Sequence, residues 1–349
     1  MPCHGAAARS GASSVPPLQA TDKGARAKRP AFRGRNEEEV RQDKGEGLRA
    51  MANAEAGGAA RIFRDYDQAT LDRELNLRAR WPEHVDYFAR WARDSAAVRG
   101  DLPGRLDLAY GAGPAEVLDL FPVDGASAAP LLAFIHGGYW QSLDKGDFSY
   151  LAPAFGEVGI AFASLNYGLA PDARIGTMIN QVRRALAWLY RHAGDHGVDA
   201  RRIVVAGHSA GGHLAAMALS TDWPAFDAAL PGDLLAGGCS ISGVYDLEPL
   251  RLSYHNKILQ IAPEDVAPWS PLHRLPARAA PLLLAVGSEE TREFLRQHAE
   301  YAAAWEACGL PLGEVDMPGL QHFSAVDALG DRDHGLYAAV RRLLAGGVA

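Results

Sequence analysis

The chain has 349 residues, of which 48% are hydrophobic and 22% are charged, and its formal net charge at pH 7 is −7. These values are ordinary for a globular enzyme with a sizeable core. The acidic balance excludes nucleic acid as a general partner, because phosphate binding needs a basic face. The three cysteines, Cys3, Cys239 and Cys308, form no CxxC pair, which argues against a disulfide framework or a cysteine-rich zinc site.

Targeting signals are not found in the sequence. No uninterrupted apolar run of about 18 residues occurs, so we predict no membrane span. A charged segment followed by an apolar signal region is also missing, so we expect no secretory signal. Together with a cysteine content typical of a reducing compartment, these observations predict a cytoplasmic protein. The sequence leaves the oligomeric state open, with a homodimer as one candidate.

Residues 1–60 differ in composition from the rest of the chain. They are rich in Ala, Gly, Arg and Pro, and residues 1–50 contain ten Lys or Arg against six acids. Such a segment buries too little apolar surface to offset its chain entropy, so we predict a disordered extension followed by a folded domain over 61–349. Met51 is a candidate native start. An arginine-rich organelle presequence is the alternative, against which the acids of "NEEEV" count.

After this extension the chain alternates between helical and extended patterns. Residues 66–91 have a broken apolar stripe that predicts helical structure. The later expected elements are strands 105–110, 116–121, 131–136 and 159–167, helix 175–189, strand 202–209, helix 210–220, strand 237–243, strand 282–287, helix 291–308, strand 312–317 and a last helix from about 331. Apolar strands alternating with amphipathic helices predict a mostly parallel, doubly wound α/β sheet with helices on both faces. The proline-rich segment 249–276 is expected to form a small cap.

The candidate nucleophile lies in "VVAGHSAGGHL", where G-x-S-x-G places Ser209 between Gly207 and Gly211. An apolar strand leads into the motif and an alanine-rich helix leads out, which is the context of a nucleophile elbow. The elbow raises a serine hydroxyl to a helix N-terminus, where negative charge is favoured. The amide of Ala210 would then be one oxyanion donor. An idle serine in a glycine-rich turn is the alternative.

The candidate oxyanion loop is "IHGGYW" at residues 135–140, which ends another apolar strand. Two glycines at this point let the backbone approach a bound group with free N–H donors. Gly137 and Gly138 are the expected donors. Tyr139 and Trp140 are candidates for an aromatic substrate pocket, although Trp140 is equally suited to packing against the loop.

His322 in "MPGLQHFS" is the expected general base, because it follows the last strand in the order Ser, acid, His. His334 is the alternative base, whereas His208 and His213 are expected to point away from the site. The acid should come from a loop beside the base. Glu289 and Glu290 follow the strand 282–287, and Asp246 after the preceding strand competes with them.

Taken together, these motifs resemble those of the kynurenine formamidase (arylformamidase) group of α/β-hydrolases, which are related to the hormone-sensitive-lipase-like esterases. The similarity covers about residues 65–345 and rests on "HGGYWQS", "GHSAGGHLAAM", "SGVYDLEPL", "WSPLHRL", "EFLRQ" and "HFS". It implies an α/β-hydrolase fold and a metal- and cofactor-independent enzyme. It also implies that Ser209 is the nucleophile and His322 the base. The family's acid is an aspartate three residues after the strand-ending glycine, a position held here by Glu290.

The predicted function is therefore the hydrolysis of an N-formyl aryl amide such as N-formylkynurenine through an acyl-enzyme. A carboxylesterase for short acyl or aryl esters is the close alternative, because the same residues cleave esters. A third alternative is a non-catalytic binding module on a hydrolase scaffold, which the presence of both Ser209 and His322 disfavours. The expected partner is a small aromatic amide or ester.

Overall fold

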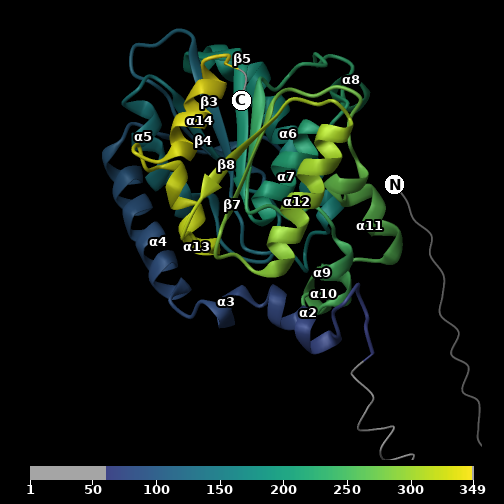
Figure 1. Ribbon diagram of the computed structural model, residues 1–349. Coiled ribbons are helices and arrows are strands. Elements are labelled where there is room, and N and C mark those ends of the chain that lie inside the picture. The colour runs from purple at the N-terminus through teal and green to yellow at the C-terminus, as the bar shows by residue number, and fades with distance from the viewer. Residues whose placement is uncertain (1–59, 348–349) are drawn as a thin grey trace, which may run out of the picture. The chain divides into compact units, whose positions relative to one another are not determined.

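The computed structural model describes residues 60–347 (Figure 1). The predictions for residues 1–59, including Met51 as the start, lie outside this range. The centre of the described part is an eight-stranded sheet in the order β1-β2-β4-β3-β5-β6-β7-β8. Its strands are β1 (Arg105–Ala109), β2 (Val117–Phe121), β3 (Ala129–Ile135), β4 (Ala161–Leu165), β5 (Val198–His208), β6 (Gly237–Ile241), β7 (Leu282–Gly287) and β8 (Leu312–Met317).

The sheet is mostly parallel, as predicted. Strand β2 pairs antiparallel with both β1 and β4, and the remaining neighbours are parallel. Strands β3 and β5 lie in the centre, with Ile135 opposite Gly207. Their apolar residues are almost completely buried, which explains their continuous hydrophobic runs. Because parallel strands end at one edge of the sheet, the loops after β3, β5, β7 and β8 meet there.

Helices cover both faces of the sheet (Figure 1). On one side lie α6 (Ile175–His192), α7 (Ala210–Leu219) and α12 (Arg292–Ala307), and on the other α4 (His84–Asp101), α5 (Ala152–Gly156) and α14 (Gly335–Leu344). Helix α6 buries Ile179, Val182 and Leu186, which are members of the predicted apolar stripe. Helix α7 is buried along its whole length, which its small alanines allow. The α/β-hydrolase fold is thereby confirmed.

The segment 66–91 forms three helices: α2 (Gln68–Leu75), α3 (Leu77–Arg80) and the first part of α4. The first break is at Asn76, whose side chain accepts a hydrogen bond from the amide of Ala79 and so begins α3. The second break contains Pro82, which precedes α4.

The segment 249–276 contains most of α9 (Glu248–Leu252), α10 (Asn256–Leu259), α11 (Pro263–Trp269) and the short 3-10 turn Pro271–His273. In Figure 1 this segment lies near α2. Its role as a cap stays a prediction. Within residues 60–347, no helix is both long and apolar enough to cross a membrane.

Candidate active site

Ser209 occupies a sharp turn between β5 and α7. Its backbone has φ 57° and ψ −118°, a conformation that L residues rarely adopt. The flanking glycines are required by the surrounding backbone, because a Cβ on Gly207 would lie 2.1 Å from the carbonyl oxygen of Gly211. A Cβ on Gly211 would lie 2.0 Å from the carbonyl oxygen of Ile135. This strained strand–turn–helix geometry is that of a nucleophile elbow.

The glycine loop after β3 lies directly against this turn. A Cβ on Gly137 would be 3.1 Å from the Cβ of Ser209, and Gly138 has φ 101°, a conformation that suits glycine. In the part of the chain that the structure describes, the amides of Gly137, Gly138 and Ala210 donate no hydrogen bond to another residue. Three free donors beside one serine hydroxyl form an arrangement that can bind an oxyanion.

His136 and Tyr167 support the glycine loop through contacts with its backbone. The Tyr167 hydroxyl donates to the carbonyl oxygen of His136 at 2.9 Å, and the two rings stack with centroids 4.4 Å apart. His136 also contacts the carbonyl oxygen of Gly137 and the side chain of Asn166. Burial lowers the pKa of His136, so its imidazole stays neutral. Its position matches the predicted role of orienting the loop.

His322 and Glu290 form a buried pair. The Nδ1 atom of His322 lies 3.0 Å from Oε2 and 3.1 Å from Oε1 of Glu290, and the side chains are only 3% and 0% exposed. A carboxylate accepts and cannot donate, so we assign the proton to Nδ1. The Nε2 atom of His322 is then free to accept a proton. His322 begins α13 (His322–Ala325) after β8, and Glu290 lies between β7 and α12.

The competing acids have other environments. Glu289 is exposed. Asp246 is buried, but its Oδ1 accepts from the amide of Glu248 at 2.9 Å and its Oδ2 lies 3.5 Å from Arg296. Of the three candidates, the structure brings only Glu290 into contact with His322. The alternative base His334 instead caps α14, where its Nδ1 accepts from Leu336.

His208 has a position that the sequence analysis got wrong. It was expected to point away from the site, but its Nε2–H donates to the carbonyl oxygen of His322 at 2.9 Å. The centroids of the His208 and His322 rings are 4.6 Å apart. Burial and the neighbouring His322 hold the pKa of His208 well below its usual value, so it stays neutral. No sequence signal distinguishes this contact. By contrast, His213 donates to the carbonyl oxygen of Trp269.

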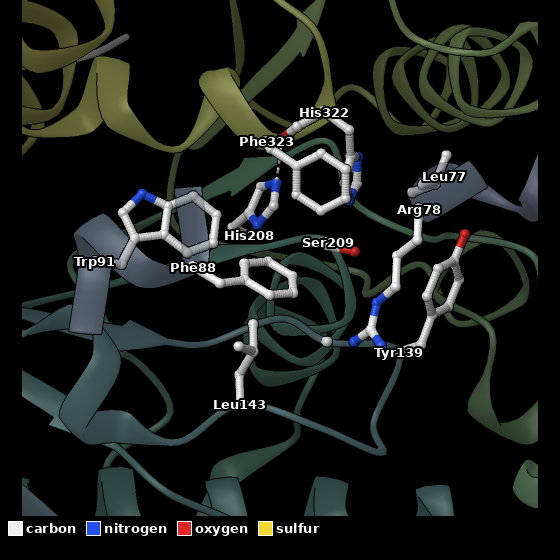
Figure 2. A pocket seen from close by; sticks show the side chains of 11 residues that line it. Leu77, Arg78, Phe88, Trp91, Tyr139, Leu143, His208, Ser209, His322 and Phe323 are labelled. Carbon is white, nitrogen blue, oxygen red and sulfur yellow. Dashed lines mark hydrogen bonds between the residues drawn. The ribbon is translucent and has the colours of Figure 1, made fainter. Parts of the chain in front are cut away.

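A small cavity opens at Ser209 (Figure 2). The space open to the centre of a water molecule in this cavity is about 30 Å³. Helices α3 and α4 contribute its outer wall, which the sequence analysis did not predict. The lining residues are Leu77, Arg78, Phe88, Trp91, Gly138, Tyr139, Leu143, His208, Ser209, His322 and Phe323.

The two predicted substrate-binding aromatic residues have different positions. Tyr139 lines the cavity, and its hydroxyl donates to the carbonyl oxygen of Leu75 at 2.8 Å. Trp140 is fully buried and packs edge-on against His213, so it lies behind the loop and does not line the cavity. Its indole ring is therefore suited to packing against the loop, in line with the alternative given by the sequence.

No cluster of three or more His, Cys, Asp or Glu side chains with the spacing of a metal site occurs between residues 60 and 347. The chemistry that the arrangement supports needs only protein groups. A serine hydroxyl, an imidazole paired with a carboxyl group, and free backbone amides are together sufficient for acyl transfer.

Comparison with known proteins supports an α/β-hydrolase related to kynurenine formamidases and esterases. Residues 118–238 match the family model BD-FAE, and residues 179–338 match the prolyl oligopeptidase family. Kynurenine formamidase from Danio rerio is 32% identical over 66% of this chain and 78% of its own length. The enzyme of that name from Salmo salar is 31% identical over 71% of this chain and 84% of its own length.

Among solved structures, a candidate thioesterase from Silicibacter sp. TM1040 superposes with a TM-score of 0.70. It is 31% identical and covers 78% of this chain and 98% of its own. Esterase B from Lactobacillus rhamnosis, at 18% identity and a TM-score of 0.61, covers 80% of this chain and 96% of its own and shares the fold. The protein is thus a serine hydrolase acting on esters or formamides, and the chain belongs to the kynurenine formamidase-like group of α/β-hydrolases.

Proposed function

We propose that this protein hydrolyses an N-formyl aryl amide, such as N-formylkynurenine, to the free aryl amine and formate. The observation that carries the proposal is that Ser209, Gly138 and His322, the last paired with Glu290, line one small cavity with several aromatic side chains. The amides of Gly137, Gly138 and Ala210 are free to donate. The two formamidase relatives support the same substrate class.

The reaction proceeds through a formyl-enzyme. The hydroxyl oxygen of Ser209 attacks the formyl carbon while the Nε2 atom of His322 takes the hydroxyl proton. The formyl oxygen becomes an oxyanion that the free amides beside Ser209 bind. His322 then gives its proton to the aryl nitrogen, the C–N bond breaks and the amine leaves.

Water completes the cycle. His322 removes a proton from a water molecule, which attacks the formyl ester, and the proton returns to Ser209 as formic acid leaves and loses its own proton to solvent to become formate. Glu290 keeps the imidazole in the tautomer with Nδ1 protonated and stabilises the imidazolium in both steps. Each step is balanced by groups already present in the site.

The size of the cavity favours a small acyl group. A formyl group has only two heavy atoms, and the space open to the centre of a water molecule in the cavity is small, about 30 Å³. The aryl group must then extend outward past Phe88 and Phe323, whose rings pack edge-to-face with centroids 5.6 Å apart. A carboxylesterase for short acyl or aryl esters is the second candidate, because an acetate or formate ester needs the same acyl space and ester hydrolases occur among the relatives.

Steady-state kinetics tests the proposal. We expect kcat/KM to be higher for N-formylkynurenine than for p-nitrophenyl acetate. Ser209→Ala should lower kcat for both substrates by about 10³-fold or more, because the nucleophile is removed. Ser220→Ala, at the opposite end of α7, is the matched control and should retain activity. A formamide rate at or below the ester rate would make the protein an esterase.

A further inference from the structure

Arg78 stands out among the residues that line the cavity. It is the only one of these eleven that carries a permanent charge, since His208 and His322 are titratable and the others have no ionic side chain. It comes from α3, far from the nucleophile in sequence. A permanent cation in a wall made mostly of apolar and aromatic side chains needs a physical reason.

The Arg78 side chain is held in place by two contacts. Its Nη2 donates to the hydroxyl of Ser142 at 2.8 Å, and that hydroxyl donates to the carbonyl oxygen of Gly138 at 3.1 Å. The guanidinium also lies over the ring of Phe88, 5.5 Å from its centroid. Figure 2 shows it between the rings of Phe88 and Tyr139. One hydroxyl group thus separates the cation from the glycine loop.

No acid on the described chain neutralises this cation. Other arginines of the described chain have carboxylate partners, as Arg90 has with Asp327 and Arg296 has with Glu293. For Arg78, Ser142 is the one hydrogen-bond acceptor found among residues 60–347. A guanidinium has five N–H donors in a planar fork, so a pair of donors stays available to a carboxylate.

We propose that Arg78 binds a carboxylate on the leaving-group half of the substrate, and that the enzyme therefore prefers aryl amides or esters that carry a carboxylate. The inference rests on the proposed hydrolysis at Ser209. The acyl group would occupy the small inner cavity, and the aryl ring would contact Phe88. The carboxylate would lie at the exposed rim, where an ion is least costly to hold.

The test uses two matched substrate pairs in which only the carboxylate changes. The first pair is N-formylkynurenine and its α-carboxamide, and the second is O-acetyltyrosine and O-acetyltyrosinamide. In Arg78→Gln we expect kcat/KM for the carboxylate member to fall about 10- to 30-fold, mostly through KM, because this contact forms in the ground state and transition state alike. The carboxamide member, which already lacks the ionic partner, should lose less than about 3-fold.

Three further variants distinguish binding of the substrate carboxylate by Arg78 from a role of Arg78 in anchoring the glycine loop. Arg78→Lys keeps the charge but not the fork, so it should give an intermediate loss in KM. Ser142→Ala removes the anchor and keeps the cation, so it should preserve the preference for the carboxylate. Arg80→Gln is the matched control, because Arg80 is exposed on the same helix, lies over Trp81 and does not line the cavity.

The proposal is overturned by either of two results. One is an equal loss on both members of a pair in Arg78→Gln, which would make Arg78 an anchor of the loop. The other is a wild-type enzyme with no preference for the carboxylate member of either pair. If the ester pair reacts faster than the formamide pair, the proposed function fails, yet the ester pair still measures the role of Arg78.

Discussion

The two halves of the active site are built in different ways. Ser209, Glu290 and His322 follow directly after β5, β7 and β8, so the edge of a parallel sheet brings them together. Arg78 and Phe88 come from α3 and α4, which precede the sheet in sequence and reach the cavity only through side-chain packing. In the first half the backbone fixes each group. In the second half the contacts among side chains do so.

This difference suggests a division of work. In the proposed mechanism, the strand-end residues hold the groups that make and break bonds with any substrate. The helical residues form the wall that a leaving group must pass. Changes in the first half should therefore act on kcat with every substrate, whereas changes in the second should act on KM and depend on the substrate.

Among tests of this difference between the two halves, the largest expected loss of kcat is at Glu290. Glu290→Gln should lower kcat by about 10²- to 10³-fold with every substrate, because a neutral amide cannot stabilise the imidazolium of His322. Steady-state kinetics on the formamide and the ester measures this loss. Glu289→Gln is the matched control and should retain activity, since Glu289 is exposed one residue away. A greater loss in Asp246→Asn would show that the acid is assigned wrongly.

A second effect concerns His255, which connects the two halves. Its Nε2–H donates to the carbonyl oxygen of Leu75 at 3.2 Å, and its ring stacks on Tyr139 with centroids 4.0 Å apart. Burial lowers its pKa from 6.5 to about 4. As pH falls from about 6.5 to about 4, the unfolded chain binds a proton at His255 that the folded protein does not bind. The free energy of unfolding should therefore decrease through this window, by up to about 3 kcal/mol from this group.

Urea unfolding at several pH values measures this dependence. His255→Gln has no group that titrates at this position, so its free energy of unfolding should fall less steeply between pH 6.5 and pH 4 than that of the wild-type protein. The difference between the two slopes isolates His255 from carboxylates that titrate in the same range. Parallel pH profiles for the two proteins would refute the role given to burial at this position.

The smallest expected effect is on KM, when an aromatic side chain that lines the cavity, Phe88, is removed. Phe88→Ala should raise KM for aryl substrates about 3- to 10-fold and leave kcat nearly unchanged, because it removes apolar contact with the leaving group. Val85→Ala is the matched control, since Val85 lies one turn earlier on α4 and is 57% exposed. A loss confined to kcat would contradict the division between the two halves.

The sequence predicted the strand-end half well for a physical reason. Buried parallel strands have continuous apolar runs, and the glycines that must follow them, such as Gly207 and Gly137, mark where the backbone turns sharply. Chain order alone then placed Ser209, an acid and His322 at one edge. The choice among Glu289, Glu290 and Asp246 depended on family register, and only Glu290 contacts His322 in the structure.

The helical half could not be predicted in the same way. Residues 66–91 show only a broken apolar stripe, and the breaks at Asn76 and Pro82 that direct α3 toward the cavity were not recognised. The direction of the Arg78 side chain is set by two residues. Ser142 is 64 residues away in the sequence, and Phe88 lies on another helix, α4. Such contacts depend on tertiary packing and leave no periodic signal in the sequence.

The central claim is that this site removes a formyl group. The most direct measurement compares kcat/KM for N-formylkynurenine and N-acetylkynurenine, each divided by its rate of hydrolysis by hydroxide to correct for intrinsic reactivity. We predict a corrected preference for the formyl compound of about 10-fold or more, because one extra methyl group must fit a cavity of about 30 Å³. A corrected rate for the acetyl compound that equals or exceeds the formyl rate would contradict the claim.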